Sequence, residues 1–365
     1  MTDTAQLHAS IEQALATLPY PAQPEGLYEP IAYTLTGGGK RLRPTLVLLA
    51  YSLYREDWEQ ALPAAVGLEI YHNHTLLHDD LMDRADLRRG RPTVHTRWGD
   101  NTAILSGDTM LILAFRHIMR ANAEPARWAE VLDLFARTAQ QICEGQQMDM
   151  NFERRSDVTE AEYLEMIRLK TSVLLGCATQ MGALLAGAPA ADGQALYAFA
   201  EQVGLAFQLQ DDYLDVYGDP AQFGKRLGGD IRCGKKTYLL FAALRDAAPD
   251  EREALLGMLA DQSADPAEKV ARVTTTSRPS ACRPNACARS GTTRAASWAG
   301  KANAAMYIDT HTHIYLPEFD ADRNAVLRRA RTAGARWLLL PCIDLDSVGP
   351  MLATCAAAPD LCRPM

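Results

Sequence analysis

Two short acidic motifs with the same spacing are the residues of this chain best suited to chemistry. The first motif, DDLMD, contributes Asp79, Asp80 and Asp83, and the second, DDYLD, contributes Asp211, Asp212 and Asp215. Each follows an apolar helical run, and residues four apart on a helix share one face. A single cluster is usually a solvated helix face, but two copies of like charges at helical spacing favour a bound cation. Oxygen ligands without His or Cys favour Mg²⁺, which commonly bridges carboxylates and substrate phosphates.

Basic residues recur beside both acidic motifs. They are Lys40, Arg41 and Arg43 in the segment GGGKRLRP, Arg88, Arg89 and Arg91 after the first motif, Lys170 next to Thr171, and Lys225 and Lys235 after the second motif. Any one of them could be an ordinary surface cation. Their placement next to both carboxylate clusters is what a metal–diphosphate site needs, because arginine forks chelate phosphate oxygens. The stretch GxxxxGK from Gly229 to Lys235 is rejected as a nucleotide-binding loop, because Lys236 stands where the hydroxyl belongs.

Helices are predicted to position these side chains. Residues 1–270 are rich in Ala, Leu, Gln and Glu, with apolar residues at three- and four-residue steps and few alternating strand patterns. Examples of such helical stretches are Val131–Ile142, Tyr163–Gln180 and Leu196–Leu214. Glycine and proline clusters interrupt the pattern, as at Arg89–Pro92. An all-α bundle of about ten helices is therefore expected for residues 1–270.

The character of the sequence changes near residue 270. No Asp or Glu occurs from Lys269 to Ile308, where arginines are mixed with small residues. Such a segment cannot bury enough apolar surface to offset its ordering entropy, so 271–305 is predicted to be a disordered linker. Residues 306–365 then form the pattern of an incomplete α/β fragment: a short strand at Ile308, a helix at Asn324–Ala333 and a strand at Trp337–Pro341.

Composition limits the classes of function. The net charge of −8 argues against nucleic-acid binding, which needs a dense basic surface. No apolar run approaches the roughly 18 residues of a transmembrane segment, and the first residues lack the pattern of a signal peptide. Eight scattered cysteines without a framework spacing fit free thiols in a reducing compartment. A cytoplasmic location is expected.

From about residue 10 to 270 the chain resembles the trans-prenyl diphosphate synthases, which make geranyl, farnesyl and longer chains. The resemblance rests on motifs that follow one another in family order: GGGKRLRP, HxxxLLHDDLMDRADLRRGRPTVH, GDTML, EGQQMDM, LKTS, FQLQDDYLDVYGD and GKRLGGDIRCGKKTYLL. It implies an isoprenoid-synthase-type helical bundle around a central cavity, and a homodimer. It also implies a condensation of isopentenyl diphosphate with an allylic diphosphate.

The resemblance assigns roles by position. It implies that isopentenyl diphosphate is held by Lys40, Arg43, His72 and Arg89. It implies that more than one Mg²⁺ is bound by Asp79, Asp83 and Asp211, with help from Asp80, Asp212 and Asp215. It implies that the allylic diphosphate is contacted by Arg88, Lys170, Thr171, Gln208, Lys225 and Lys235. Metal and cations would neutralise the departing diphosphate, while an apolar cavity keeps water from the allylic cation.

Product length in this family depends on the residues four and five places before the first Asp, here Thr75 and His74. A helix rises about 5.4 Å per turn, so a bulky side chain one turn below the site stops the growing tail early. The size of His74 predicts a short product near C15. The alternative is that His74 only packs between helices.

The last 60 residues, 306–365, resemble the opening of TatD-like metal-dependent deoxyribonucleases, with His311 and His313 as the HxH pair of a first barrel strand. A complete barrel needs about 200 residues or more, and two histidines are too few for a catalytic metal. No nuclease activity and no nucleic-acid partner are therefore expected. The helices that normally follow residue 270 in the synthase family are replaced by the linker, as a reading-frame slip into a neighbouring gene would produce.

Other functions remain open from sequence alone. The chain could be a non-catalytic prenyl-diphosphate-binding or regulatory subunit, although both acidic motifs are complete. It could also be the inactive product of a gene fusion. A terpene cyclase is disfavoured, because such enzymes rarely keep GGGKRLRP and an isopentenyl site.

Overall fold

The computed structural model describes residues 3–155, 157–217, 249–260, 307–309, 314–320, 322–332, 335–340 and 348–364, together with nine single residues between 231 and 312. The chain divides into two compact units, Met1–Pro279 and Ser280–Met365. The first unit carries every site residue predicted for prenyl transfer. The predicted linker, 271–305, lies outside the described residues and stays a prediction.

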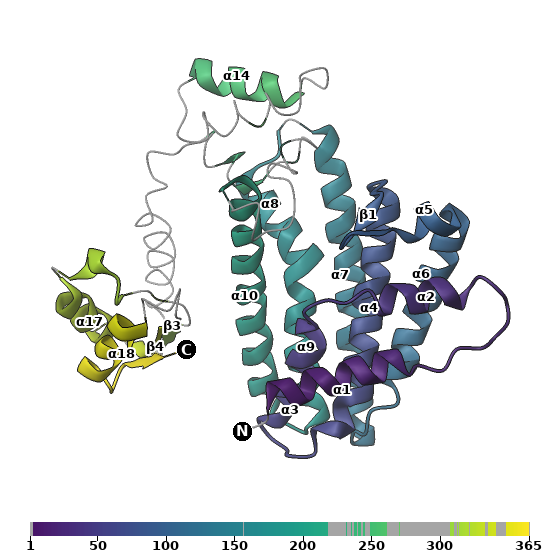
Figure 1. Ribbon diagram of the computed structural model, residues 1–365, viewed down its shortest axis with the longest axis horizontal. Helices are drawn as coiled ribbons and strands as arrows, with labels where there is room; N and C mark the ends of the chain where they lie inside the picture. The colour runs from purple at the N-terminus through teal and green to yellow at the C-terminus, as the bar shows by residue number, and fades with distance from the viewer. Residues whose placement is uncertain are drawn as a thin grey trace. The chain divides into compact units, whose positions relative to one another are not determined.

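The described part of the first unit is built from helices (Figure 1). In chain order they are α1 (Thr4–Ala16), α2 (Tyr28–Leu35), α3 (Leu42–Ser52), α4 (Leu62–Met82), α5 (Val94–Trp98), α6 (Asp100–Ile118), α7 (Trp128–Arg154), α8 (Glu160–Ile167), α9 (Val173–Leu185), α10 (Ala190–Tyr217) and α14 (Pro249–Ala260), with short 3-10 turns at Trp58–Ala61 and Pro125–Arg127. The helical stretches predicted at Val131–Ile142 and Leu196–Leu214 fall within α7 and α10, and the stretch predicted at Tyr163–Gln180 spans α8, the π-helical segment Arg168–Ser172 and α9.

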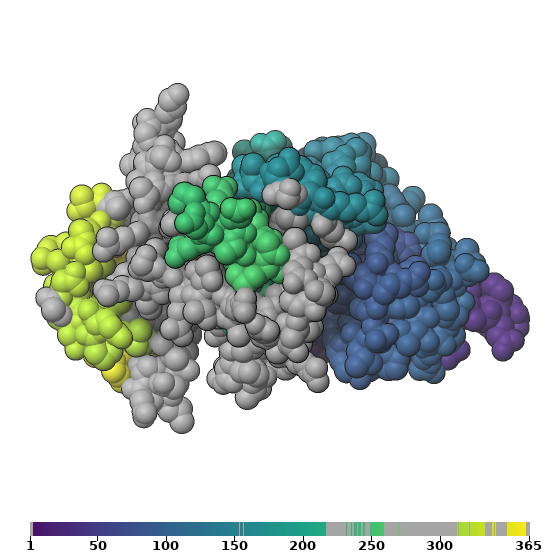
Figure 2. Space-filling view, turned by 90° about the horizontal axis from the view of Figure 1, so that it is seen from above, coloured from purple at the N-terminus to yellow at the C-terminus, as the bar shows by residue number. Residues whose placement is uncertain are grey.

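Local sequence explains where several helices start and which face they bury. The Asp3 carboxylate caps α1 by accepting a hydrogen bond from the backbone N–H of Ala5, and the apolar face of this helix repeats at Leu7, Ile11 and Leu15. Thr159 opens α8 with a capping box, in which Thr159 and Glu162 satisfy each other's backbone N–H groups. Helix α14, bright green at the surface in Figure 2, buries Leu255 and exposes most of its other described side chains.

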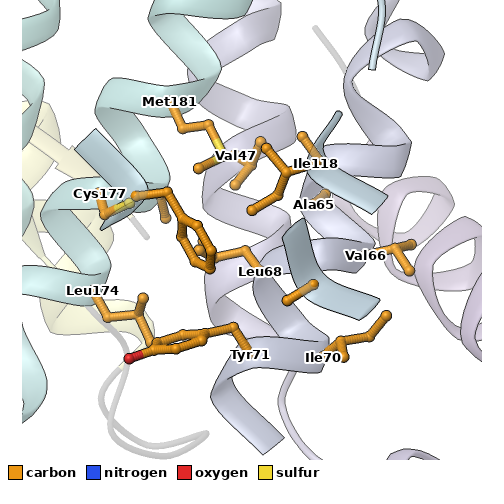
Figure 3. Close-up of a cluster of buried hydrophobic side chains, with 14 of the residues drawn as sticks. Val47, Ala65, Val66, Leu68, Ile70, Tyr71, Ile118, Leu174, Cys177 and Met181 are labelled. Carbon is orange, nitrogen blue, oxygen red and sulfur yellow. The ribbon is translucent and has the colours of Figure 1, made fainter. Parts of the chain in front are cut away.

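Helices α4 and α9 form the centre of the bundle. Helix α9 is buried along almost its whole length, and α4 has a continuous buried run from Ala64 to Tyr71. Figure 3 shows Leu68 and Tyr71 of α4 beside Leu174 and Cys177 of α9, with Met181 and Ile118 nearby. This largely apolar packing fixes the middle of α4, the helix that carries the first acidic motif at its C-terminal end.

A small β-hairpin interrupts the helices where the sequence pattern indicated only a break. Strands β1 (Leu87–Arg88) and β2 (Arg91–Pro92) pair antiparallel around the two-residue turn Arg89–Gly90. Both turn residues have positive φ, 52° for Arg89 and 74° for Gly90, as a type I′ turn requires. Glycine adopts this conformation freely, whereas Arg89 does so at a cost of about 1–2 kcal/mol.

The second unit contains three parallel strands in the order β3–β4–β5, formed by Tyr307–Asp309, Ala335–Leu340 and Cys362–Pro364. Helices α17 (Arg323–Thr332) and α18 (Val348–Ala357) connect them, and residues such as Ile314, Leu327 and Leu340 form its core. This β–α–β order is the local pattern expected of residues 306–365. The incomplete barrel itself stays a prediction.

No helix among the described residues is long and apolar enough to span a membrane.

Candidate active site

The first acidic motif ends α4 and faces the segment between α8 and α9. Asp79 lies in the last turn of α4 and Asp83 is its C-terminal cap residue. The Nζ atom of Lys170 lies 3.2 Å from Oδ1 of Asp79, an ion-pair contact outside hydrogen-bond geometry, and Lys235 Nζ lies 3.9 Å from Oδ2 of Asp83. The structure therefore brings together two predicted carboxylates and two predicted cations.

Asp79 and Asp83 have an electrostatic environment that favours a bound cation. Burial, and then the neighbouring Asp79, raise the pKa of the Asp83 carboxyl above its ordinary value. Oδ1 of Asp79 is buried and accepts no hydrogen bond. Two carboxylates one helical turn apart, one with an unsatisfied oxygen, suit Mg²⁺, which is usually held by one or two carboxylates together with substrate phosphates. The donor set present therefore fits the predicted metal.

Among the described residues, the side chains of the second acidic motif do not complete a metal site with Asp79 and Asp83. Within the described ranges, no three His, Cys, Asp or Glu side chains are grouped so that they could hold one metal ion. The joint assignment of Asp79, Asp83 and Asp211 as metal ligands stays a prediction.

Asp80 has a different role from its neighbour Asp79. The residue is buried at 6% exposure, and both of its side-chain oxygens lie 2.8 Å from Nε of Arg88, which donates to them. Burial raises the pKa of Asp80, although the Arg88 guanidinium opposes this shift. Nη2 of Arg88 also lies 3.6 Å from Oδ2 of Asp79. Asp80 therefore holds Arg88 next to the exposed part of the motif.

Asp212 has a matching position in the second motif. It is 3% exposed and accepts hydrogen bonds from the Tyr163 hydroxyl, from the backbone N–H of Tyr238 (3.2 Å) and from Nε2 of Gln208 (3.5 Å). Burial raises the pKa of Asp212, and these donors oppose the shift. The predicted ligand residue Gln208 thus contacts Asp212 one turn along α10. The flanking residues Asp211 and Asp215 are both partly exposed.

The glycine-rich segment GGGKR bends sharply before α3. Gly38 and Gly39 have φ of 79° and 139°, a region that glycine adopts without strain, and Arg41 follows with φ of 46°. Arg41 is 2% exposed and donates to Glu69 Oε1 at 2.8 Å, to Glu12 Oε1 at 2.7 Å and to the Leu35 carbonyl at 2.7 Å. This cation joins α1, α3 and α4, so it is not available to a substrate.

Arg43 and His72, both predicted to bind isopentenyl diphosphate, are in contact. Nη1 of Arg43 donates to Nε2 of His72 at 3.1 Å, so this nitrogen must be the unprotonated one. Burial, followed by the charges of Arg43 and Arg89, lowers the pKa of His72 well below its ordinary value, and the ring is neutral at pH 7. Nε of Arg43 is buried without a hydrogen-bond partner, which leaves one donor for an anion.

Arg89 and Lys40 are the other two residues predicted to bind isopentenyl diphosphate. Arg89, at the tip of the β1–β2 hairpin, donates to the carbonyl of Gly38, and burial together with the charges of Arg41 and Arg88 lowers its pKa. Lys40 is exposed. Arg88, Arg89 and Arg91 are among the residues that line an open pocket between α2, α4 and the hairpin. The hairpin therefore concentrates positive charge beside α4.

His74 and Thr75, the predicted limits of product length, are held by neighbouring atoms. Nδ1 of His74 lies 2.9 Å from the carbonyl oxygen of Gly107 in α6, and its ring lies 4.6 Å from that of His78. Burial and His78 lower the pKa of His74 to about 4. The Thr75 hydroxyl donates to the carbonyl of His72. The His74 ring is thus packed against α6.

Asp149 is a site residue that sequence reasoning missed. Its Oδ2 accepts a hydrogen bond from Lys170 Nζ at 2.6 Å. Burial alone would lower the pKa of Lys170, but Asp79 and Asp149 raise it above its ordinary value. The available signal was EGQQMDM, a motif noted for its family likeness without a role for its aspartate. Three predicted residues, Lys225, His311 and His313, lie outside the described residues.

Comparisons with known proteins identify the family of this chain. A profile described as polyprenyl synthetase matches residues 24–276. The chain belongs to the polyprenyl synthetase family. The predicted resemblance to trans-prenyl diphosphate synthases is thereby confirmed, and the helical unit has the isoprenoid-synthase fold. The TatD-like assignment of residues 306–365 stays a prediction.

Individual members of the polyprenyl synthetase family are similar over most of their length. A geranylgeranyl diphosphate synthase of Methanosarcina mazei is 43% identical over 240 residues, 66% of this chain and 73% of that protein. The crystal structure of a geranylgeranyl pyrophosphate synthase superposes with a TM-score of 0.75 at 42% identity, covering 81% of this chain and 92% of that one. A polyprenyl synthase from Caulobacter crescentus, complexed with calcium and isoprenyl diphosphate, gives a TM-score of 0.66 at 29% identity, covering 82% and 89%.

Proposed function

We propose that this chain is a Mg²⁺-dependent trans-prenyl diphosphate synthase, which joins isopentenyl diphosphate head-to-tail to an allylic diphosphate. The observation that carries the proposal is the ion-pair contact of 3.2 Å between Asp79, at the end of α4, and Lys170. It is found in a chain that belongs to the polyprenyl synthetase family. Carboxylates that can bind a metal and an ammonium group that can bind phosphate oxygens are the two requirements for activating a diphosphate as a leaving group.

On the allylic side, Asp79, Asp83 and Asp211 are proposed to hold more than one Mg²⁺. Bound Mg²⁺ would supply charge neutralisation for the departing diphosphate. Calcium accompanies isoprenyl diphosphate in the Caulobacter crescentus structure, which supports a divalent metal here.

The chain's own groups act around the metal. Lys170, Thr171, Arg88, Gln208, Lys225 and Lys235 are proposed to bind the allylic diphosphate. Asp80 and Asp212 act through the Arg88 and Tyr163 side chains that they hold, and Asp215 supports the second motif.

On the isopentenyl side, Lys40, Arg43, His72 and Arg89 are proposed to bind the second diphosphate. The unsatisfied Nε of Arg43 and the neutral His72 ring beside it suit this role, because Nε is a donor that no protein acceptor takes.

The reaction then follows from charge. The C–O bond of the allylic diphosphate breaks and its electron pair leaves with diphosphate. The double bond of isopentenyl diphosphate attacks the allylic cation, forming the new C–C bond. A proton lost to the released diphosphate restores a double bond, in a product five carbons longer. A site that excludes water protects the cation.

Two product lengths are separable by experiment. The size of His74 predicts a product near C15, whereas two of the relatives named above carry the name of the C20 product, geranylgeranyl diphosphate. We favour C20 for this chain, because the His74 ring is drawn against α6 by Gly107. Homodimerisation and a cytoplasmic location stay predictions from sequence.

The test uses the purified full-length chain with labelled isopentenyl diphosphate and, in separate reactions, dimethylallyl, geranyl or farnesyl diphosphate. Label should enter longer products in Mg²⁺, and EDTA should abolish this incorporation. The double variant D79A/D211A provides the control for contaminating enzymes. Incorporation no greater than that of the double variant, with all three primers, would refute the proposal and favour a non-catalytic subunit.

A further inference from the structure

The helix that carries Lys170 and Thr171 is widened at these residues. The backbone N–H of Val173 bonds to the carbonyl of Arg168, five residues earlier, so Arg168–Ser172 forms a π-turn between α8 and α9. Single π-turns inside helices frequently occur at functional sites, and their extra residue disturbs regular side-chain packing. Lys170 therefore depends on the neighbouring helices for a fixed position.

Two glycines bring neighbouring helices to backbone distance from this π-turn. A Cβ atom added at Gly145 of α7 would lie 2.4 Å from the backbone nitrogen of Lys170 and 2.9 Å from the carbonyl carbon of Leu169. A Cβ atom added at Gly204 of α10 would lie 2.8 Å from Cα of Ser172. These are backbone contacts, which cannot be relieved by a change of rotamer.

The glycines lie in the interior of long helices, where they are otherwise unfavourable. Alanine is the better helix former at such positions, because glycine loses more backbone entropy on folding. Neither Gly145 nor Gly204 has a φ in the left-handed region, so conformational freedom does not account for them. Their position is explained by the space they leave for the π-turn.

Helix α7 also binds the tip of the Lys170 side chain. Asp149 lies four residues after Gly145 and so on the same face of α7. Its Oδ2 lies 2.6 Å from Nζ of Lys170, which in turn lies 3.2 Å from Oδ1 of Asp79. One face of α7 thus contacts Lys170 at both its backbone and its ammonium group.

We propose that Gly145, Gly204 and Asp149 form a clamp that positions Lys170 for the allylic diphosphate. All three are positioning residues, which act through Lys170. The assignment rests on the proposed function, since that function gives Lys170 its ligand.

The backbone part of the clamp is tested without any activity. Gly145→Ala and Gly204→Ala are compared with Gly193→Ala, a matched control in α10 whose added Cβ would lie at an ordinary 3.5 Å from Cγ of Gln180. Hydrogen–deuterium exchange of the peptide covering Arg168–Val173 is expected to become at least tenfold faster in the first two variants. The control is expected to match the wild type. Equal exchange in all three variants would overturn the clamp.

Steady-state kinetics test the positioning role. Gly145→Ala is expected to raise KM for dimethylallyl diphosphate by about 10- to 100-fold, the scale of a misplaced binding group, with KM for isopentenyl diphosphate changed less than twofold. Asp149→Asn, which adds no bulk, is expected to raise the same KM by at least fivefold while exchange of the π-turn stays at the wild-type rate. A parallel rise of both KM values would contradict positioning.

The two proposals fail in different ways. A wild-type chain without prenyl transfer would refute the proposed function, whereas the exchange experiment would still decide whether the glycines hold the π-turn. Should Gly145→Ala and Gly204→Ala not fold, Asp149→Asn decides: an unchanged KM for dimethylallyl diphosphate would overturn the clamp.

Discussion

The buried ion pair between Arg41 and Glu69 offers the sharpest test of how the first unit is held together. Oε1 of Glu69, which is 3% exposed, accepts hydrogen bonds from Arg41 at 2.8 Å and from Nδ2 of Asn73 at 3.0 Å. Glu69→Gln keeps the shape of the side chain and removes its charge. Leaving a buried charge without its partner costs about 3–5 kcal/mol. Because Glu12 still contacts Arg41, we expect the lower part of this range, about 3 kcal/mol.

Glu12→Gln is the matched control, since Glu12 pairs with the same guanidinium. The Glu12 side chain is 39% exposed, whereas the Arg41 side chain is fully buried. A partner accessible to water is typically worth about 0–1 kcal/mol. The two variants should therefore differ by about 2 kcal/mol or more, although both remove one negative charge beside Arg41.

Urea unfolding followed by far-UV circular dichroism measures this difference. For a unit of this size, about 3 kcal/mol corresponds to a fall in Tm of roughly 6–12 °C, which a thermal scan would also detect. Equal destabilisation by Glu69→Gln and Glu12→Gln would refute the reasoning. Arg41 would then be held chiefly by its contact with the Leu35 carbonyl.

Three further predictions concern the site and its surroundings. Asp79→Asn is expected to lower kcat at least 100-fold in the labelled-isopentenyl assay, because it removes a negative carboxylate proposed to hold the metal that neutralises the departing diphosphate; activity within tenfold of wild type would contradict this. His74→Ala is expected to leave the product length unchanged, because the His74 ring is drawn against α6 by Gly107, and a product longer by five carbons or more on chromatography would show that His74 limits the chain. His74 has a folded-state pKa of about 4, below its unfolded value of about 6.5, so the unfolded state binds more protons between these values and stability falls as the pH drops through them. His74→Phe should reduce this loss of unfolding free energy at low pH by up to about 3 kcal/mol, measured from urea midpoints at several pH values.

Much of the fold was predictable because helical periodicity and family motifs are local signals. The sequence stretches that form α7, α9 and α10 carry apolar residues at helical spacing. This spacing gives each helix an apolar face, and that face packs into the core. The β1–β2 hairpin was harder to predict. Its strands have two residues each, too short for an alternating pattern, and its turn uses Arg89 at a φ that arginine seldom adopts.

The sequence could not separate carboxylates that face the site from those that support it. Asp79 and Asp80 are adjacent and look equivalent, yet Asp80 is bound by Arg88, eight residues further along the chain. Asp212 is likewise held by Tyr163, 49 residues earlier. Such roles depend on partners distant in the chain, which no spacing rule supplies. Arg41 illustrates the same limit. In the sequence it looks equivalent to Lys40 and Arg43, yet its guanidinium is paired with Glu69, 28 residues further along the chain.

The placement of two adjacent arginines on one hairpin has a consequence for redesign. Arg88 contacts the carboxylates of α4, while Arg89 contacts the glycine loop before α3. Under the proposed assignment, the two diphosphates are therefore bound by consecutive residues of a single β-hairpin. Engineering that alters this hairpin would change the recognition of both substrates together. Selective tuning of one substrate calls for changes elsewhere, in α3 for the isopentenyl partner or in the π-turn for the allylic partner.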